Sequence, residues 1–342
     1  MGSYNVANKI KLLRTGVIGL GVGEQHVKTY QAIDGCEVKA ICDFDTDHMN
    51  RVGNDYGINE RYDDYRRITE HPDIDIVSIC TFDNYHAEQA ISSLNNGKHI
   101  MVEKPVALNR HDAERILRAQ QDNNRHIISN FILRKSPRFE EVRQQVQSGE
   151  FGEIFHIEGD YLHHILHKVT EGWRGGMEFY CVAYGGGIHL IDLMRWIMGQ
   201  EVIEVCSMGN NLLSRGSQFK FEDCLTSLFK FEGGATGKTT TAFGLQRTKF
   251  HALNVYGERK SFVNDMPDAK LFDGDQPENV HSVTTPYQSM KKGDHLPDFV
   301  QAIRTGNEPG VTVQDVFRVM DICFAAWEAL QKQSTIKITY SI

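Results

Sequence analysis

The chain has 342 residues, of which 40% are hydrophobic, and 37 Lys and Arg residues against 45 Asp and Glu residues give a formal net charge of −8. This length predicts about two domains, and the negative charge argues against nucleic acid as a partner. No apolar stretch suits a signal peptide or a membrane span, and seven cysteines without a Cys-x-x-Cys pair favour free thiols, so we expect a cytoplasmic protein without membrane contact.

The amino-terminal part alternates strand and helix patterns. Strands are predicted at residues 12–20, 38–43, 74–81, 99–102 and 127–132, with helices through Tyr30 and at 46–56, 87–95 and 110–123. Such alternation is typical of a parallel sheet with helices on both faces. The sequence therefore predicts an α/β, doubly wound Rossmann domain over residues 1–132.

Glycines stand where the first predicted strand passes into the first helix. Gly19, Gly21 and Gly23, with Val22 among them, let the backbone approach a pyrophosphate, whose charge the helix amino terminus favours. Counted from Gly19, the usual Gly-x-Gly-x-x-Gly pattern has Glu24 at its third position. We therefore expect a dinucleotide loop whose helix packs less closely, or whose loop carries an extra residue.

An acidic residue ends the second predicted strand. Asp43 lies about 20 residues beyond the glycines, where a carboxylate binds the ribose hydroxyls of NAD. It would repel a ribose phosphate, and no arginine follows it directly. We therefore expect NAD as the cofactor rather than NADP, although Lys or Arg side chains from elsewhere could still reach such a phosphate.

Polar residues also follow the next two strands. Thr81 and His86 lie after the third strand, and Glu103 and Lys104 lie after the fourth. Because the carboxyl ends of parallel strands form the ligand-binding edge of such a sheet, we expect these four residues to contact the cofactor. Glu103 is expected to bind ribose or to hold Lys104.

After residue 132 the pattern changes to longer alternating strands separated by Gly-rich turns. Strands are predicted at 154–162, 201–210, 225–231, 235–243, 251–256 and 335–342, helices at 298–304 and 313–331, and a long surface loop at 265–286. We therefore expect a second domain of the α+β type over residues 133–342.

The chain resembles the Gfo/Idh/MocA oxidoreductases, the family of glucose-fructose oxidoreductase and inositol dehydrogenase. The resemblance rests on the glycine loop with Glu24-Gln25-His26, Asp43, residues 81–86, Glu103-Lys104-Pro105, residues 131–134 and 149–152, residues 185–192, and the terminal part from Asp298. It implies a Rossmann domain, a second domain with an open, largely antiparallel sheet, and a tightly held nicotinamide cofactor. It also implies a sugar or polyol substrate and homodimers or homotetramers formed through that sheet.

Removal of a hydride from an alcohol needs a proton acceptor and a cation that favours the alkoxide. The resemblance implies that Lys104 faces the reacting carbon, with a lysine that only bonds the turn as the alternative. His189 is the candidate acid/base, and Asp192 follows it on one helical face. Many family members carry Asp where this chain has Gly185, so either Asp192 orients His189 or Lys104 alone handles the proton.

Other residues are candidates for substrate contact. Arg174, after Trp173, can bind a carboxylate or phosphate, with a surface ion pair as the alternative. Arg134 and Tyr161 are expected at the domain junction for the same reason, and Asp192 is a further candidate. Three histidines, at 163, 164 and 167, lack a Cys or carboxylate at ligand spacing, so we expect them to line a substrate loop and expect no metal.

Together these features predict an NAD-dependent dehydrogenase acting on a ring hydroxyl of a sugar, cyclitol or nucleotide-linked sugar. Two alternatives stay open. Some relatives hydrolyse glycosides through transient oxidation with no net use of NAD, and the same fold serves in cofactor-sensing transcriptional regulators. The presence of Lys104 and His189 argues against a sensor, which needs neither residue.

Overall fold

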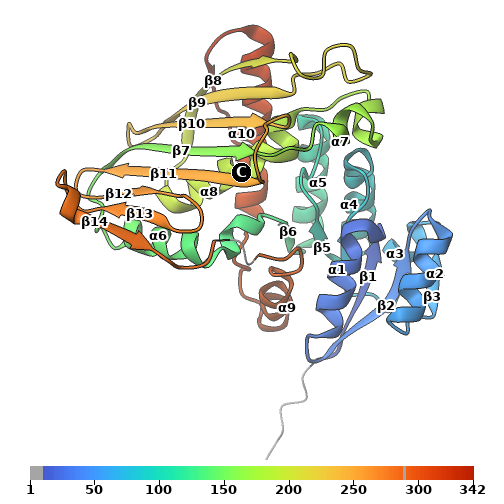
Figure 1. Cartoon of the computed structure of the whole chain (residues 1–342). Coiled ribbons are helices and arrows are strands. Elements are labelled where there is room, and N and C mark those ends of the chain that lie inside the picture. The colour runs from blue at the N-terminus through green and yellow to red at the C-terminus, as the bar shows by residue number, and fades with distance from the viewer. Residues whose placement is uncertain (1–10, 288–289) are drawn as a thin grey trace, which may run out of the picture. The chain divides into compact units, whose positions relative to one another are not determined.

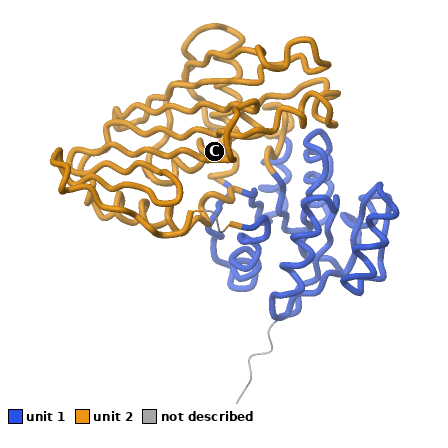
Figure 2. The backbone as a smooth tube through the Cα atoms, in the orientation of Figure 1, with its two compact units in different colours: residues 1–103, 115–130, 291–313 blue, residues 104–114, 131–290, 314–342 orange. Residues whose placement is uncertain are grey.

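The computed structural model describes residues 11–287 and 290–342, which divide into two compact units (Figure 2). Unit 1 contains the chain up to Glu103 together with 115–130 and 291–313, and unit 2 contains 104–114, 131–290 and 314–342. The predicted boundary after residue 132 stays a prediction. The expectation of no signal peptide rests partly on the first ten residues, which lie outside the described residues.

Unit 1 is built on a six-stranded sheet with the order β3-β2-β1-β4-β5-β6, in which every pairing is parallel (Figure 1). The strands are β1 (Leu13–Ile18), β2 (Cys36–Cys42), β3 (Glu60–Tyr62), β4 (Ile76–Ile79), β5 (His99–Val102) and β6 (Ile127–Ser129). All residues of β4 are buried, as expected for a parallel strand covered on both faces. The strand order reverses between β1 and β4, the point at which such sheets bind ligands, so the predicted Rossmann sheet is confirmed.

The helices of unit 1 come from three separate stretches of the chain. They are α1 (Leu20–Gln31), α2 (Thr46–Asp55), α3 (Arg66–Thr69), α4 (His86–Asn95), the later part of α5 (Arg110–Asn123) and α9 (Leu296–Thr305). The segment with α9 lies on α1: a Cβ on Gly293 would be 2.0 Å from the hydroxyl of Thr29, and Arg304 donates to the carbonyl of Asp34 (2.6 Å). This late segment thus groups with the Rossmann sheet, which the sequence pattern did not indicate.

Unit 2 is built on a nine-stranded sheet with the order β14-β13-β12-β11-β7-β10-β9-β8-β15. The strands are β7 (Ile154–Leu162), β8 (Val202–Asn210), β9 (Cys224–Phe231), β10 (Thr236–Ala242), β11 (Phe250–Gly257), β12 (Ser261–Val263), β13 (Ala269–Phe272), β14 (Val280–Val283) and β15 (Ile336–Lys337). Among the strands that the structure describes in this sheet, only the central β7–β10 pairing is parallel, so the predicted open and largely antiparallel sheet is confirmed.

Unit 2 also contains several helices. They include α6 (Pro137–Gln147), α7 (His167–Thr170), α8 (Ile188–Met198) and α10 (Val313–Lys332), and a π-helical turn at Ala183–Gly187 leads directly into α8. Leu190 of α8 packs closely on β7, because a Cβ on Gly159 would lie 3.1 Å from the Cβ of Leu190. In the described ranges, no helix is long and apolar enough to cross a bilayer.

Two predictions for unit 2 are wrong. The stretch 265–286, expected to be a loop, contains the hairpin β13–β14, because its prolines fall in the turns rather than in the strands. The closing strand expected at 335–342 shortens to β15, since the chain after it is held by Asp321, whose Oδ2 accepts from the amide of Ser341 (2.7 Å). By contrast, the predicted bounds of β5, β7 and α5 agree with the structure.

Candidate functional site

The dinucleotide loop of unit 1 joins β1 to α1 at Gly19. This residue has a φ of 82°, and a Cβ on it would lie 2.6 Å from the carbonyl oxygen of Cys80, so only glycine fits. Gly21 is exposed, and a Cβ on it would meet no described atom within 4 Å. The loop therefore offers open backbone at the first turn of α1, where a pyrophosphate binds.

Gly23 supplies the close helix packing that the third glycine of the usual pattern provides. It is buried, and a Cβ on it would lie 2.8 Å from Cγ1 of Val17 on β1. The prediction of looser packing is wrong, because α1 begins so soon after Gly19 that Gly23, rather than residue 24, faces the strand. Glu24 instead pairs with Arg51 of α2 (2.7 Å).

The carboxylate of Asp43 is fixed beside this loop. Its Oδ2 accepts a hydrogen bond from the amide of Leu20, the first residue of α1 (2.6 Å), and its Oδ1 accepts from the amide of Asp45 (2.9 Å). The negative charge at the end of β2 therefore cannot swing away from the loop without losing both bonds. This position supports ribose binding and NAD over NADP.

Replacing Asp43 by alanine should weaken NADH binding about tenfold to a hundredfold, because one charge-assisted hydrogen bond is worth about 1.5–3 kcal/mol. The preference for NADH over NADPH should fall at the same time. Fluorescence titration with both cofactors measures this, and Asp45→Ala, which removes an exposed acid two residues away, is the matched control. An unchanged NADH to NADPH ratio in Asp43→Ala would contradict the role of this carboxylate.

Thr81 and His86 lie together at the end of β4. The Nε2 of His86 lies 3.1 Å from the carbonyl oxygen of Thr81, and the Thr81 hydroxyl donates to Oε1 of Gln89 (2.7 Å). His86 is fully buried, whereas Thr81 is partly exposed. His86 thus holds the turn that presents Thr81, and a cofactor contact by either residue stays a prediction.

Glu103 is the centre of a buried polar cluster at the end of β5. Its Oε1 accepts from Nδ2 of Asn130 (2.6 Å) and lies 4.0 Å from Nε2 of His26, while its Oε2 lies 3.8 Å from Nζ of Lys292. Burial lowers the pKa of His26 to about 4, so this imidazole is neutral at neutral pH. The sequence pattern missed Asn130 and Lys292, which no motif marks.

Lys104, the next residue, belongs to unit 2. Its Nζ donates a hydrogen bond to the carbonyl oxygen of Gly185 (2.7 Å), inside the π-helical turn that leads into α8. The side chain is only partly buried. The ammonium is thus anchored on a carbonyl four residues before His189, in the turn that leads into the helix of His189.

His189 is the second residue of α8 and is 4% exposed. Its ring stacks on that of Tyr161, with centroids 6.4 Å apart and an interplanar angle of 22°. The neighbouring turn permits this, because a Cβ on Gly186 would lie 2.7 Å from Cδ1 of Tyr161. The Tyr161 hydroxyl in turn lies 3.2 Å from Nδ1 of His163. The structure therefore brings Tyr161 and His189 together.

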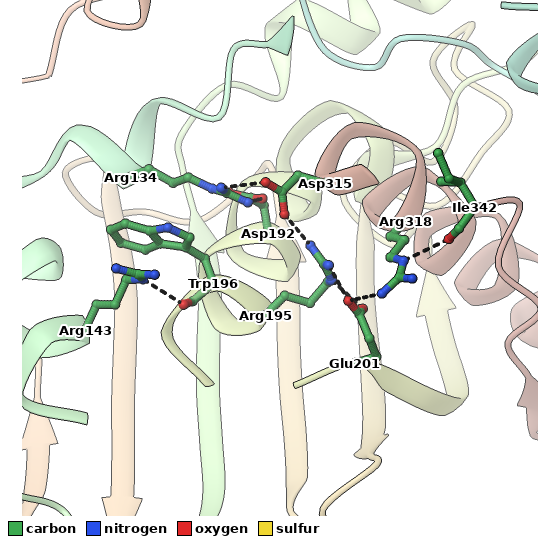
Figure 3. Close-up of polar contacts among 9 residues, drawn as sticks. All are labelled: Arg134, Arg143, Asp192, Arg195, Trp196, Glu201, Asp315, Arg318 and Ile342. Atoms are coloured by element: carbon green, nitrogen blue, oxygen red, sulfur yellow. Dashed lines mark hydrogen bonds and ion pairs between the residues drawn. The ribbon is translucent and has the colours of Figure 1, made fainter. Parts of the chain in front are cut away.

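Arg134 and Asp192 form a buried ion pair in unit 2 (Figure 3). Arg134 donates to both carboxylate oxygens of Asp192 (2.9 and 2.6 Å) and also to Oδ2 of Asp315 (3.0 Å). Burial raises the pKa of Asp192, and the guanidinium of Arg134 opposes that shift. Both carboxylate oxygens of Asp192 accept hydrogen bonds from Arg134, so the geometry does not support orientation of His189 by Asp192. Substrate contact by Arg134 and Asp192 stays a prediction.

The ion pair continues into a network that ties α8 to α10. Arg195 of α8 contacts Asp315 (3.2 Å) and Glu201 (2.5 Å), and Glu201 also accepts from Arg318 (2.8 Å), as Figure 3 shows. The network fixes the helix that carries His189.

Loss of the negative charge of Asp192 should destabilise the fold. Asp192→Asn removes the charge of the carboxylate that binds the buried Arg134 guanidinium at two oxygens and leaves only Asp315 to pair with it, so we expect a loss of about 3 kcal/mol in the free energy of unfolding. Urea denaturation measures it, with Glu328→Gln as the control, because the exposed Glu328–Lys332 pair should contribute well under about 1 kcal/mol. Equal stability of the two variants would contradict a structural role for the network.

Trp173 and Arg174 lie in a short helical turn, Trp173–Gly176. The guanidinium carbon of Arg174 lies 4.1 Å from the centre of the Trp173 ring, and both side chains are partly buried. In the part of the chain that the structure describes, no three His, Cys, Asp or Glu side chains are grouped to hold a metal ion.

Two family models match the chain. The model described as an oxidoreductase family with an NAD-binding Rossmann fold matches residues 13–131, and the model described as the GFO/IDH/MocA C-terminal domain matches residues 139–263. The chain belongs to the Gfo/Idh/MocA family. The expectations of an oxidoreductase family, a Rossmann domain and NAD as its cofactor are confirmed.

Named relatives match this family member over about half of its length or more. Myo-inositol 2-dehydrogenase of Thermotoga maritima is 24% identical over 339 residues, which are 95% of this chain and 98% of that one. Inositol 2-dehydrogenase of Salmonella typhimurium is 27% identical over 193 residues, 55% of either chain. Among solved structures, levoglucosan dehydrogenase in complex with NADH has a TM-score of 0.86 at 23% identity and covers 96% of this chain and 100% of that chain. This structural similarity concerns the fold.

The place where many Gfo/Idh/MocA proteins carry Asp is filled by a different polar group here. A Cβ on Gly185 would lie 1.9 Å from the hydroxyl oxygen of Tyr180. Tyr180 is 2% exposed, and its ring makes edge contacts with Phe219 and Phe243, with centroids 5.9 and 6.4 Å apart. The hydroxyl of Tyr180 therefore lies against Gly185, whose carbonyl anchors Lys104, and a side chain at position 185 has no room.

Gly185→Ala should destabilise the fold by about 1–3 kcal/mol, the usual cost of overpacking. Tyr180→Phe should relieve part of this cost, because it removes the oxygen at 1.9 Å and leaves Cζ at 2.8 Å as the nearest atom. Urea denaturation of both single variants and the double variant measures the coupling. Gly176→Ala is the control, since a Cβ there meets no described atom within 4 Å. Additive effects of the two single changes would contradict the contact.

Proposed function

We propose that the protein is an NAD-dependent dehydrogenase that transfers a hydride between a ring hydroxyl of a sugar, cyclitol or nucleotide-linked sugar and the nicotinamide. The observation that carries this proposal is the anchoring of Lys104 on Gly185, one turn before His189, in a chain with an NAD-binding Rossmann fold. The named relatives support the substrate class, since they include inositol and levoglucosan dehydrogenases.

The proposed roles follow from what the oxidation of an alcohol requires. NAD, when bound, supplies the nicotinamide carbon that accepts the hydride. The Lys104 ammonium stabilises the negative charge that develops on the substrate oxygen. His189 takes the hydroxyl proton during oxidation and returns it during reduction. Gly19, Gly21 and the fixed carboxylate of Asp43 hold the pyrophosphate and ribose.

The test begins with native mass spectrometry for bound NAD and continues with NADH absorbance across sugars, inositols and nucleotide-linked sugars. We expect NAD binding and NADH formation with at least one of these substrates. Release of a reducing sugar from a glycoside without NADH formation would favour the redox-neutral hydrolase instead. NAD binding with neither reaction would favour a sensor.

We also propose a cytoplasmic homodimer or homotetramer formed through the open face of the unit 2 sheet. Met208 and Leu228, 80% and 53% exposed, lie on adjacent strands on the face opposite to α8. All seven cysteines are free thiols, which suits a reducing compartment. Light scattering of the purified protein tests the oligomer, and a monomer at micromolar concentration would contradict it.

A further inference from the structure

The π-helical turn before α8 contains three consecutive glycines, Gly185, Gly186 and Gly187. Their backbone is helical, and none of the three has a positive φ, so the conformation of the turn does not require glycine. Glycine inside a helix weakens the helix relative to alanine. The presence of three in a row therefore has another reason, which lies in the packing around the turn.

Side chains from other parts of unit 2 occupy the places that side chains of these glycines would take. A Cβ on Gly185 would lie 1.9 Å from the hydroxyl oxygen of Tyr180. A Cβ on Gly187 would lie 2.4 Å from Oγ1 of Thr241 on β10. Tyr180 and Thr241 are both buried. The glycines therefore let buried hydroxyl-bearing side chains pack directly on the backbone of the turn.

Aromatic rings continue this packing as far as His189. Phe243, which follows β10, contacts Tyr180 and Tyr161, with ring centroids 6.4 and 5.9 Å apart. Tyr161 and Phe243 both pack on Gly186, since a Cβ there would lie 2.7 and 3.0 Å from their ring carbons. Tyr161 in turn stacks on the imidazole of His189. Buried rings therefore connect the side of the turn that Tyr180 contacts to the proposed acid/base.

Tyr180 meets the turn at the residue that holds Lys104. The carbonyl oxygen of Gly185 accepts from Nζ of Lys104 (2.7 Å), and the Tyr180 hydroxyl fills the side-chain position of the same glycine. Phe219 and Phe243 contact the edges of the buried Tyr180 ring, so the hydroxyl cannot move away without disturbing a packed core. Without the hydroxyl, Gly185 would face a gap, and the turn could shift toward the ring. Such a shift would displace the carbonyl together with the ammonium bound to it.

We propose that Tyr180 is a positioning residue for the reaction, whose hydroxyl fixes Gly185 and thereby orients the ammonium of Lys104. Because Tyr180 is buried, it acts through Gly185 rather than by contact with the substrate. A small shift is enough to matter, since a displacement of about 1 Å at a reacting group can lower a rate about 100-fold. This inference rests on the proposed function, because it takes Lys104 as the cation that stabilises the alkoxide.

The first test is Tyr180→Phe, which removes the hydroxyl and keeps the ring. We expect kcat to fall about tenfold, while the KM for NAD and the dissociation constant of NADH stay within about twofold of the wild type, because the loop at Gly19 is unchanged. NADH absorbance and fluorescence titration measure these constants, under conditions in which urea denaturation shows the variant to be folded. Tyr256→Phe, which removes the hydroxyl of a partly exposed tyrosine on β11, is the control and should keep full activity.

A double-mutant cycle shows whether Tyr180 acts through Lys104. In the Lys104→Met background, where the ammonium is absent, Tyr180→Phe should change kcat by less than about twofold. An equal loss of kcat in both backgrounds would overturn the inference, because the two residues would then act independently. A folded Tyr180→Phe enzyme with the wild-type kcat would overturn it as well.

Absence of any turnover by the wild-type protein would count against the proposed function, and amine labelling then tests the positioning alone. Trace acetylation followed by mass spectrometry measures the reactivity of Lys104 relative to the exposed Lys28. A weakened hydrogen bond to Gly185 should make Lys104 about three to ten times more reactive in Tyr180→Phe than in the wild type. Equal reactivity of Lys104 in the two proteins would show that Tyr180 does not position it.

Discussion

Lys104→Met should lower kcat/KM about 10³-fold, because it removes the cation that stabilises the developing alkoxide. Methionine has a similar length and no charge, so packing around the π-helical turn should persist. The lost hydrogen bond to Gly185 should cost only about 1 kcal/mol of stability. Binding of NADH should stay close to that of the wild type, since the loop at Gly19 and the carboxylate of Asp43 are unchanged.

Stopped-flow or steady-state NADH absorbance, together with fluorescence titration of NADH, separates these effects. Lys28→Met, an exposed lysine on α1, is the matched control and should keep full activity. A Lys104→Met variant that retains more than about a tenth of wild-type kcat/KM would mean that this lysine only bonds the turn. A variant that loses NADH binding would instead place Lys104 in the cofactor site alone.

Five of the six strands of the Rossmann sheet were predicted from the sequence because each is a local pattern, whereas β3 was not predicted. Buried strands such as β4 and β5 are short apolar runs, and Gly19 and Asp43 mark strand ends by residue type alone. The same reasoning failed for Gly23, because the position that faces β1 depends on where α1 begins. The first residue of α1, Leu20, donates its amide hydrogen to Asp43, and the spacing of glycines does not reveal this contact.

The parts of the candidate site that the sequence did not predict depend on contacts between residues far apart in the chain. The spacing of His189 and Asp192 shows that they share a helical face, but it cannot show that Arg134, 58 residues before Asp192, takes both carboxylate oxygens. Likewise, Gly185 is a departure from the family pattern in the sequence. Only the packing of Tyr180 against it shows that a hydroxyl fills that place.

His189→Asn should lower kcat by about 10²-fold to 10³-fold, because general acid/base catalysis by a positioned side chain contributes about that much. Asparagine keeps a planar polar group of similar size against Tyr161 but does not exchange a proton near neutral pH. The variant should therefore also lose the acidic limb of the pH dependence of kcat/KM. His281→Asn, an exposed histidine on β14, is the control and should keep that limb.

The two catalytic variants together decide how the proton moves, and they do so whichever residue orients His189, because both carboxylate oxygens of Asp192 already accept from Arg134. If His189 is the proton acceptor, the slower Lys104→Met enzyme should keep the acidic limb and His189→Asn should lose it. If Lys104 handles the proton alone, the pattern reverses, and His189→Asn should retain most of its activity with an unchanged pH profile. Rates measured between about pH 5 and pH 10 span the ordinary pKa range of an imidazole and most of that of an amine, so the profiles distinguish the two mechanisms.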